Sequence, residues 1–291
     1  MTLGIDVQGL TVRFGDVTAV DDLSVRLAGG KIYGLLGRNG SGKTTLMSAI
    51  AAFLQADRGR VLVDGEQPYE NPAVTEQICL VRDSGDLADQ DSARAALKRA
   101  AKFRPNWDAE FAERLIELFR VPTRRGVARM SRGQRSALGV TVGLASRAPV
   151  TMLDESYFGM DAPSRYAFYD VLLEDYIEHP RTIVISTHLI EEVTRLFEEV
   201  VIIDQGRLVA HDETEALRMR GAAVTGAVSA VEAFTDGMTV LAERRLGGTK
   251  SVTVFGAMGA EQRARASEFD VELEPVALQD LFVHLTKEAP R

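Results

Sequence analysis

The sequence contains almost no cysteine, which limits the settings in which it would fold. Cys79 is its single cysteine, so no disulfide can form within the chain. Disulfides are typical of oxidising compartments, and a cytoplasmic protein is therefore the simplest expectation. Cys79 lies in the apolar stretch of residues 78–81, where we expect a buried thiol with no chemical role.

Long apolar runs are also missing. The longest apolar-looking stretch, residues 137–145, is interrupted by glycines and is soon followed by Arg147. A helix needs about 20 predominantly apolar residues to span a membrane. Residues 1–6 do not show the basic region and apolar run that begin a signal peptide. The sequence predicts no membrane span, and a role at a membrane would require another chain to supply the spanning part.

The chain lacks an excess of positive charge. Its 34 Lys and Arg residues are outnumbered by 42 Asp and Glu residues, which gives a formal net charge of -8. Nucleic-acid surfaces need clustered cations against the phosphate backbone, so we expect no nucleic-acid partner. The 45% hydrophobic and 26% charged content is ordinary for a globular protein. A length of 291 residues allows one large domain and a small one.

Strand-like and helix-like segments alternate over most of the chain. Two half-buried strands open it, and a continuously apolar strand follows a Gly-Gly turn. We predict strands at 5–13, 17–27, 31–36, 61–64, 150–154, 182–186 and 200–204, and helices at 43–54, 92–103, 108–119, 163–177 and 189–196. This pattern predicts an α/β fold, with an antiparallel β part at the N-terminus and a mostly parallel sheet flanked by helices.

A change in composition near Arg220 indicates a domain boundary. Residues 221–226 are small and flexible in character. Beyond them, strands at 239–245 and 250–255 flank a Leu-Gly-Gly-Thr turn, and helices are predicted at 260–269 and 277–287. We therefore expect a main domain at residues 1–220, with a helical subdomain at about 83–147, and a small α/β domain at residues 221–291.

A glycine-rich segment lies between a predicted strand and a predicted helix. It consists of Gly37, Arg38, Asn39, Gly40, Ser41, Gly42, Lys43, Thr44 and Thr45. In this P-loop pattern the glycines let backbone N–H groups converge on phosphates, Lys43 reaches the β- and γ-phosphates, and the Thr44 hydroxyl can ligate Mg²⁺. The helix that follows adds the positive end of its dipole. A chance glycine turn is the alternative, and the strand and helix around the loop count against it.

Two carboxylates follow the apolar strand at residues 150–154. Asp154 ends this strand and Glu155 comes next. An α/β sheet presents its ligand groups where parallel strands end. Asp154 suits the Mg²⁺ site and Glu155 suits the attacking water. An acidic pair alone would more often be a solvated helix cap, but a P-loop in the same chain favours the chemical role.

Further motifs resemble those of ATP-binding-cassette (ABC) proteins. Met130-Ser131-Arg132-Gly133-Gln134 resembles the Leu-Ser-Gly-Gly-Gln signature and precedes the acidic strand, as in that family. Phe158-Gly159-Met160-Asp161 resembles the D-loop, and Ser186-Thr187-His188 resembles the switch-histidine segment. Phe14 stands where the family has an aromatic residue that stacks on adenine. The resemblance covers about residues 3–217 and implies a P-loop ATPase of the ABC type.

The resemblance implies a head-to-tail dimer that binds ATP and Mg²⁺. The P-loop of one subunit and the signature of the other would enclose one ATP, with Ser131 facing the γ-phosphate. The signature residues concerned are Ser131, Arg132, Gly133 and Gln134. Lys43, Glu155 and His188 would be the catalytic residues, with His188 holding the γ-phosphate. Asp161 would connect the two sites.

Each of these residues also has a purely structural interpretation. A serine at a helix start is commonly an N-cap, as Ser131 would then be. A phenylalanine on a strand, such as Phe14, is commonly a core residue. Three other histidines, His179, His211 and His284, lack motif neighbours, and we expect them to serve in packing.

The chain departs from the usual ABC pattern at several positions. Asp83 takes the place of a Gln that senses Mg²⁺ and couples to the transport partner, and its carboxylate could still ligate the metal. Arg132 replaces the first glycine of the signature, where its guanidinium would contact a phosphate or point to solvent. Ser156 and Tyr157 replace the usual Pro-Thr pair. These departures leave open the alternative that the chain is a regulatory cassette that hydrolyses ATP slowly.

Two further resemblances concern the branch of the family. Residues 276–286 are similar to the closing helix of bacterial drug- and antibiotic-exporter ATPase subunits. Arg104-Pro105-Asn106-Trp107-Asp108 is similar to a segment of ATPase subunits associated with cell-envelope stress and antibiotic response. An ordinary amphipathic helix and a packing role for Trp107 are the alternatives.

These resemblances imply an exporter whose ATPase subunit lies on the inner face of the cell membrane. It would work as a homodimer or heterodimer of cassettes with a separate polytopic membrane subunit. The rival is a non-transport ATPase that serves DNA or ribosomes. Long coiled coils, a second cassette and a basic charge balance would favour that rival, and the sequence shows none of them.

Overall fold

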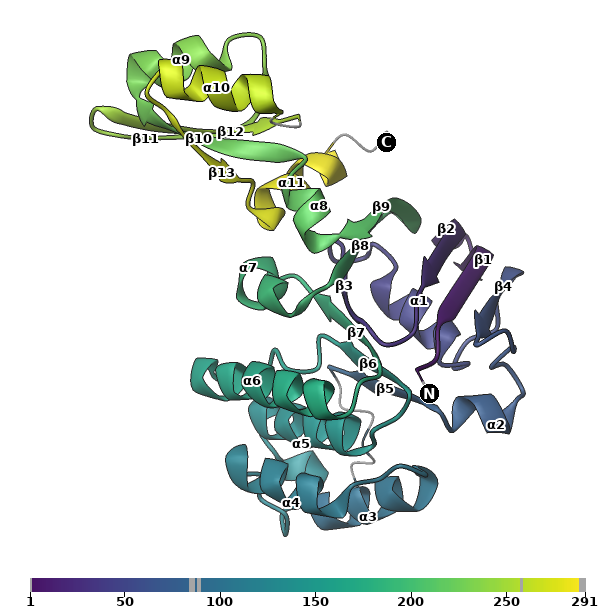
Figure 1. Cartoon of the computed structure of the whole chain (residues 1–291). Helices are drawn as coiled ribbons and strands as arrows, with labels where there is room; N and C mark the ends of the chain where they lie inside the picture. Colours follow the sequence, from purple (N-terminus) through teal and green to yellow (C-terminus); the bar gives the residue numbers. More distant parts are fainter. Residues whose placement is uncertain (1, 84–86, 88–89, 257–258, 288–291) are drawn as a thin grey trace. The chain divides into compact units, whose positions relative to one another are not determined.

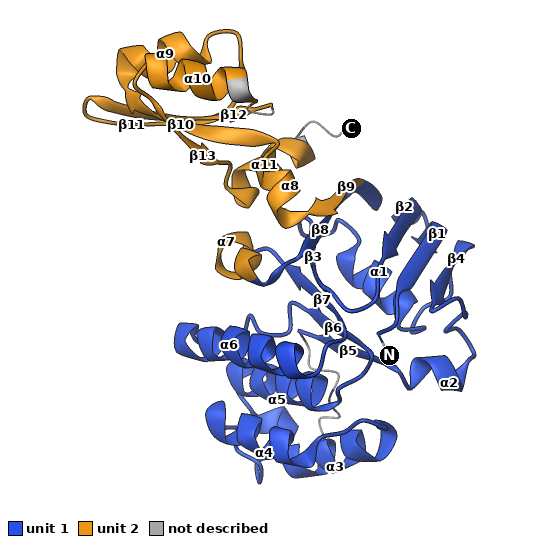
Figure 2. Ribbon diagram, in the orientation of Figure 1, with its two compact units in different colours: residues 1–188, 196–208 blue, residues 189–195, 209–291 orange. Residues whose placement is uncertain are grey.

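The computed structural model describes residues 2–83, 87, 90–256 and 259–287. The chain divides into two units, which Figure 2 colours separately. The first contains residues 1–188 and 196–208, and the second contains residues 189–195 and 209–291.

Five strands of a six-stranded sheet form the centre of the first unit, and the sixth, β9, belongs mostly to the second (Figure 1). The strand order of the sheet is β5-β6-β7-β3-β8-β9. The strands are β3 (Ile32–Leu36), β5 (Ile78–Arg82), β6 (Val150–Asp154), β7 (Thr182–Thr187), β8 (Glu199–Asp204) and β9 (Arg207–Glu213). The pairs that join β5, β6, β7, β3 and β8 are all parallel. The predicted α/β class with a mostly parallel sheet is therefore confirmed.

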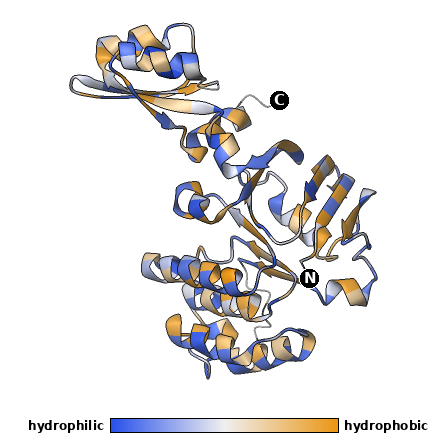
Figure 3. Ribbon diagram, viewed as in Figure 1, coloured by the Kyte–Doolittle hydropathy of each residue, from blue (hydrophilic) through white to orange (hydrophobic). Residues whose placement is uncertain are grey.

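A three-stranded antiparallel sheet packs against this centre. It has the order β2-β1-β4, and its strands are β1 (Ile5–Phe14), β2 (Val17–Leu27) and β4 (Arg58–Val63). Hydrophobic and hydrophilic residues alternate along much of β1 and β2, as Figure 3 shows. The apolar face joins one core with the buried side of α1 (Lys43–Ile50) and with residues of the parallel sheet such as Met152 and Val201. A short helix, α2 (Pro72–Thr75), precedes β5.

Helices follow β5 in the chain. They are α3 (Ala93–Phe103), α4 (Ala109–Leu118), a 3-10 turn (Val127–Arg129), α5 (Arg132–Ala145) and, after β6, α6 (Ala162–Glu178). Ser92, Asp108 and Ser131 each cap the following helix by accepting a hydrogen bond from a backbone N–H group. A Cβ at Gly143 would lie 2.9 Å from Val81 Cγ2, so glycine is what lets α5 lie close to β5.

The second unit has a βαββαβ pattern. Its parts are β10 (Gly221–Ala227), α9 (Val228–Thr235), β11 (Thr239–Leu246), β12 (Thr249–Phe255), α10 (Ala260–Glu268) and β13 (Glu272–Pro275). The antiparallel order β11-β12-β10-β13 is that of a ferredoxin-like domain. The elements α7 (Ile190–Val193), α8 (Thr214–Arg218) and α11 (Leu278–Lys287) also belong to this unit, and a 3-10 turn (Thr194–Leu196) follows α7.

The prediction of a flexible segment at residues 221–226 was wrong. This segment is β10, an inner strand that pairs with both β12 and β13. Ala222 and Val224 alternate into the core of the second unit, and a Cβ at Gly221 would lie 2.5 Å from the Val254 carbonyl oxygen. The residues here are small because the strands pack closely. Judged by composition alone, such a segment resembles a flexible linker.

Other predicted boundaries differ from the structure by a few residues. The helix after the glycine-rich loop ends at Ile50, because Ala52 has a φ of 59°, which stops the helix before residue 54. Cys79 is buried within β5, as expected. Within the described residues, no helix has the length and apolar character needed to cross a membrane.

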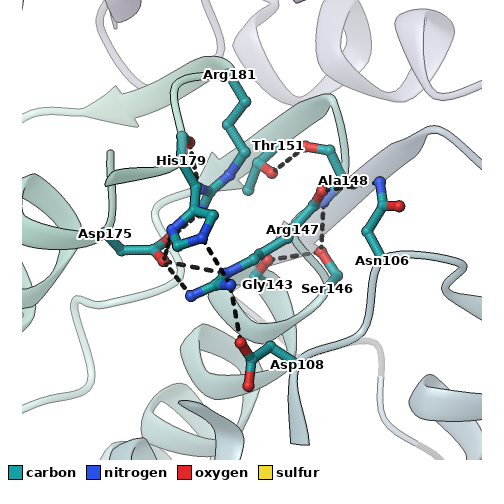
Figure 4. Close-up of polar contacts among 10 residues, drawn as sticks. All are labelled: Asn106, Asp108, Gly143, Ser146, Arg147, Ala148, Thr151, Asp175, His179 and Arg181. Carbon is teal, nitrogen blue, oxygen red and sulfur yellow. Dashed lines mark hydrogen bonds and ion pairs between the residues drawn. The ribbon is translucent and has the colours of Figure 1, made fainter. Parts of the chain in front are cut away.

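A network of charged residues joins α4, α5 and α6 (Figure 4). Arg147 Nη1 lies 2.8 Å from Asp108 Oδ2, and its Nη2 lies 3.0 Å from Asp175 Oδ1. Arg181 Nη2 lies 2.7 Å from Asp175 Oδ2, and these two side chains are only 4% and 2% exposed. The ring of His179 lies 3.1 Å from Arg147 Nη1. Asp175 thus balances two guanidinium groups inside the unit.

We expect the change Asp175→Ala to lower the free energy of unfolding by about 3–5 kcal/mol. The reason is that removal of one partner of a buried ion pair leaves the other charge uncompensated. Urea unfolding followed by the fluorescence of Trp107, the single tryptophan, measures the effect next to the network.

Glu174 provides the matched control. It precedes Asp175 on the same helix, and its ion pair with Arg114 is exposed, with side chains 62% and 61% accessible. Glu174→Ala should therefore cost at most about 1 kcal/mol. Equal losses in the two variants would show that the buried network does not hold this region together.

Candidate active site

The glycine-rich loop between β3 and α1 approaches its surroundings closely. A Cβ at Gly37 would lie 2.2 Å from Ser41 Oγ, and one at Gly42 would lie 2.4 Å from the Ala19 carbonyl oxygen. Gly40 and Gly42 have φ values of 81° and 103°, which side chains rarely adopt. Successive N–H groups in such a loop form an anion-binding concavity at the start of α1.

Lys43 is buried within this loop. Its Nζ donates hydrogen bonds to the carbonyl oxygens of Gly37 at 2.7 Å and Arg38 at 3.2 Å. It also lies 3.7 Å from Glu155 Oε1. Burial lowers the pKa of the Lys43 ammonium below its ordinary value, while the charges of Glu155 and Asp154 act in the opposite direction. The carboxylates therefore favour a charged lysine in the phosphate-binding loop.

Asp154 is the buried carboxylate at the end of β6. Its Oδ2 accepts a hydrogen bond from Thr44 Oγ1 at 2.6 Å, and its Oδ1 accepts one from Ser186 Oγ at 2.5 Å. Thr44 comes from α1 and Ser186 from β7, so Asp154 fixes both elements to the end of β6. The hydroxyl of Thr44 and the carboxylate of Asp154 are hard oxygen donors, which fit Mg²⁺.

Glu155 has a strained backbone, and its carboxylate lies near Lys43 and His188. Its φ of 49° is uncommon for a residue other than glycine. Its Oε1 lies 3.3 Å from His188 Nδ1, and its backbone N–H donates to Ser186 Oγ at 3.1 Å. The register of β6 and β7 places Asp154 beside Ser186, which explains why these groups meet. The structure thus brings Lys43, Glu155 and His188 together at the carboxyl edge of the sheet.

The signature segment begins α5. Ser131 and Gln134 form a capping box, in which the Gln134 N–H donates to Ser131 Oγ at 3.2 Å and the Ser131 N–H donates to Gln134 Oε1 at 3.1 Å. Ser131 is therefore an N-cap of α5, as its structural interpretation predicted. It does not exclude a phosphate contact, because the other N–H groups at this helix start are separate donors.

The signature and D-loop segments lie against each other. A Cβ at Gly133 would lie 2.6 Å from the Gly159 carbonyl oxygen. Asp161 caps α6 by accepting a hydrogen bond from the Ser164 N–H at 3.0 Å, and hydrogen bonds from Ser164 lower the pKa of Asp161. Ser131, Gly133 and Asp161 line a groove of about 840 Å³. Among the described residues that line this groove, none belongs to the glycine-rich loop. The predicted site residues therefore form two clusters, one at the glycine-rich loop and one at the signature and D-loop segments.

Asp83 and Arg132, both departures from the usual pattern, pair with each other. Arg132 Nη2 lies 2.8 Å from Asp83 Oδ2, and Arg132 Nε lies 3.4 Å from Asp83 Oδ1. Asp83 directly follows Arg82, which pairs with Asp154 in the sheet. The sequence left open whether the guanidinium contacts a phosphate or points to solvent. Within the chain the guanidinium contacts the Asp83 carboxylate, while 63% of the Arg132 side chain stays exposed to solvent.

Phe14 lies at the end of β1 and is 52% exposed. It is therefore not a core residue, and its ring is accessible to a ligand.

Two neighbours of the cluster received no role from the sequence. Ser186 orients Asp154, and Phe158 places its ring 4.0 Å from that of His188, centroid to centroid. A polar residue near the end of the apolar strand β7 could have indicated Ser186, whereas Phe158 meets His188 only in the folded structure.

Comparisons with known proteins show the family to which the chain is similar. A family model described as "ABC transporter" matches residues 20–157. The "Daunorubicin resistance ATP-binding protein DrrA3" of Streptomyces coeruleorubidus is 30% identical over 97% of this chain and 95% of its own length. The "ABC transporter ATP-binding protein YtrB" of Bacillus subtilis is 26% identical over 70% of each chain.

Solved structures support the same fold. A structure described as an ATP-binding subunit of an ABC transporter has a TM-score of 0.66 at 21% identity, and it covers 74% of this chain and 91% of its own. A dimeric ATP-binding cassette bound to ADP and Pi has a TM-score of 0.64 at 17% identity, with 72% and 98% covered. Because the alignment with DrrA3 is nearly complete and the fold is shared, the chain belongs to the ABC transporter family, as an ATP-binding subunit with the ATPase fold of that family.

Proposed function

We propose that this ABC ATPase hydrolyses ATP at an interface between two cassettes and so drives export through a separate membrane subunit. The observation that carries the proposal is the convergence of Lys43, Asp154, Glu155 and His188 at the edge where the glycine-rich loop lies. In-line phosphoryl transfer depends mainly on positioning and charge stabilisation, and these residues are of the types it needs.

The proposal assigns a role to each member of the cluster. The loop N–H groups and Lys43 would hold the β- and γ-phosphates, while Phe14 would stack on the adenine. Thr44 and Asp154 would hold Mg²⁺, which supplies charge neutralisation at the phosphates when it is bound. Glu155 would accept the proton of the attacking water, and the remaining phosphate-binding residues are Gly37, Arg38, Asn39, Gly40, Ser41, Gly42 and Thr45.

His188 would hold the γ-phosphate through Nε2. Its other ring nitrogen, Nδ1, lies 3.3 Å from Glu155 Oε1. A hydrogen bond at one ring nitrogen fixes the tautomer and orientation that the other presents. The arrangement supports the proposal that Glu155 both orients His188 and accepts the proton of the attacking water.

A second subunit would complete the site. The signature residues Ser131, Arg132, Gly133 and Gln134 lie with Asp161 around a groove apart from the loop of their own chain. In a head-to-tail dimer, that groove would face the nucleotide held by the partner. A homodimer and a heterodimer with another cassette both satisfy this geometry.

The export direction and the membrane partner are further parts of the proposal. DrrA3, which is named a daunorubicin resistance protein, aligns over nearly the whole chain, including the second unit. We infer a peripheral position on the inner face of the cell membrane, beside a polytopic subunit. Asp83 in place of the usual Gln is the observation that favours a second candidate, a slow regulatory cassette, although its ion pair with Arg132 shows that the two departures are coupled.

Glu155→Gln should lower ATP turnover by about 10²- to 10⁴-fold, the usual contribution of a positioned general base. The amide keeps the shape of the side chain, so binding of a fluorescent ATP analogue should be retained. Steady-state phosphate release measures the loss, and the exposed variant Glu174→Gln is the matched control. Near-normal turnover in Glu155→Gln would remove Glu155 from the role of base.

Arg132→Gln should lower the Mg²⁺ concentration that gives half-maximal turnover, by up to about fivefold. An exposed ion pair contributes about 0.2–1 kcal/mol, and its loss would free the Asp83 carboxylate for the metal. The same substitution in an Asp83→Asn background should leave the Mg²⁺ requirement unchanged. An equal shift in both backgrounds would mean that Arg132 acts without Asp83.

Tagged chain recovered from native membranes in mild detergent should carry a polytopic membrane protein in stoichiometric amount. That result, identified by mass spectrometry, supports the transporter role, and a different cassette in the same complex would make the motor a heterodimer. Recovery only from the soluble fraction, alone or with ribosomes or DNA, would contradict the transporter role. It would leave the ATP-site assignments unaffected.

A further inference from the structure

We propose that Phe158 is a positioning residue for His188, and that the buried ring of Tyr157 supports Phe158 in this role. The inference rests on the proposed role of His188 at the γ-phosphate. It begins from the contact between the two rings, whose centroids lie 4.0 Å apart with their planes tilted by 32°.

One turn of backbone holds the histidine on two sides. The Phe158 N–H donates to the Glu155 carbonyl oxygen at 3.2 Å, which closes a turn from Glu155 to Phe158. From this turn, the Glu155 carboxylate reaches the edge of the imidazole at Nδ1, while Phe158 covers a face of the ring. The strained φ of Glu155 is what starts the turn. Strain of this kind persists where the surroundings over-determine it.

The turn itself is supported from the core. Tyr157 is fully buried, and its ring lies 5.1 Å from that of Phe158. On α6, Phe168 stacks on Tyr157 at 5.2 Å and Tyr169 meets it edge-on at 5.7 Å. Aromatic pairs at these separations favour defined orientations. A continuous series of rings therefore runs from the buried side of α6 to His188.

His188 needs such support because its side chain is 49% exposed. An exposed side chain loses rotamer entropy when it is fixed, and it would otherwise sample several rotamers. A ring packed on one face and held at Nδ1 is restricted in both side-chain torsions. Phe158 therefore acts on hydrolysis through His188, by keeping Nε2 aimed at the position of the reacting phosphate.

The first test measures the contact directly in the full-length protein. With ¹³C-labelled histidine rings, Phe158→Leu should move the ring resonances of His188, because the ring current of Phe158 is lost. The resonances of His179, His211 and His284 should stay in place, and His188→Ala assigns the signal. Tyr166→Leu, which removes an exposed aromatic on α6, should move none of them. An unmoved His188 signal in Phe158→Leu would overturn the stacking contact.

The second test measures whether the contact matters for turnover. Phe158→Leu should lower kcat by about 10- to 100-fold, the cost of misplacing a group by about 1 Å, with little change in KM for ATP. Phe158→Tyr keeps the ring and should retain most of the activity. In a His188→Ala background, Phe158→Leu should cost nothing more, because residues that act as a unit are not additive.

A full further loss in the His188→Ala background would overturn the proposal, because Phe158 would then act by another route. If Phe158→Leu does not fold, Phe158→Met fills similar volume without a ring and serves both tests. Normal turnover in His188→Ala alone would instead remove the proposed role of His188. The resonance measurement would still report whether the rings stack, so the two failures are distinguishable.

Discussion

The hydrogen bonds accepted by Asp154 are the interaction on which the site depends. This buried carboxylate receives the hydroxyl of Thr44 from α1 and that of Ser186 from β7. A buried carboxylate without partners would be costly, so the two hydroxyls make its burial tolerable and at the same time fix three elements. Glu155 follows it in the chain and His188 follows β7, so their meeting at 3.3 Å is a consequence of this arrangement.

How much of this could be predicted depended on the range of the interaction. Residues 31–45 predicted a strand, loop and helix, because glycine spacing and apolar periodicity are local signals. The same holds for Asp154, whose place at the end of a parallel strand follows from the chain around it. β10 was missed, because Gly221 and Ala222 are small for reasons that lie on β12 and β13. Composition cannot distinguish a residue that is small for packing from one that is small for flexibility.

The departures from the usual family pattern also show this limit. Read separately, Asp83 and Arg132 suggested a weakened site, yet they form one ion pair between the end of β5 and the start of α5. A Cβ at Gly159 would lie 2.5 Å from Ser136 Oγ and 2.9 Å from the Arg132 carbonyl oxygen, so the start of α5 itself leaves no room for a side chain at this point of the D-loop. Two positions far apart in sequence, Asp83 and Arg132, are therefore matched to each other, which no single motif comparison can reveal.

The same reasoning changes the meaning of Ser156-Tyr157. Substitution of a usual Pro-Thr pair by these residues suggested slow hydrolysis when only the motif was considered. In the fold, Tyr157 lies fully buried against Phe168 and Tyr169, and Phe158 beside it covers His188. A loop that has lost the rigidity of proline thus gains it from packed aromatic rings, which bury large apolar areas. The residues proposed as catalytic are held in place by a different means, so departure from a motif is weak evidence for loss of activity when its neighbours have changed with it.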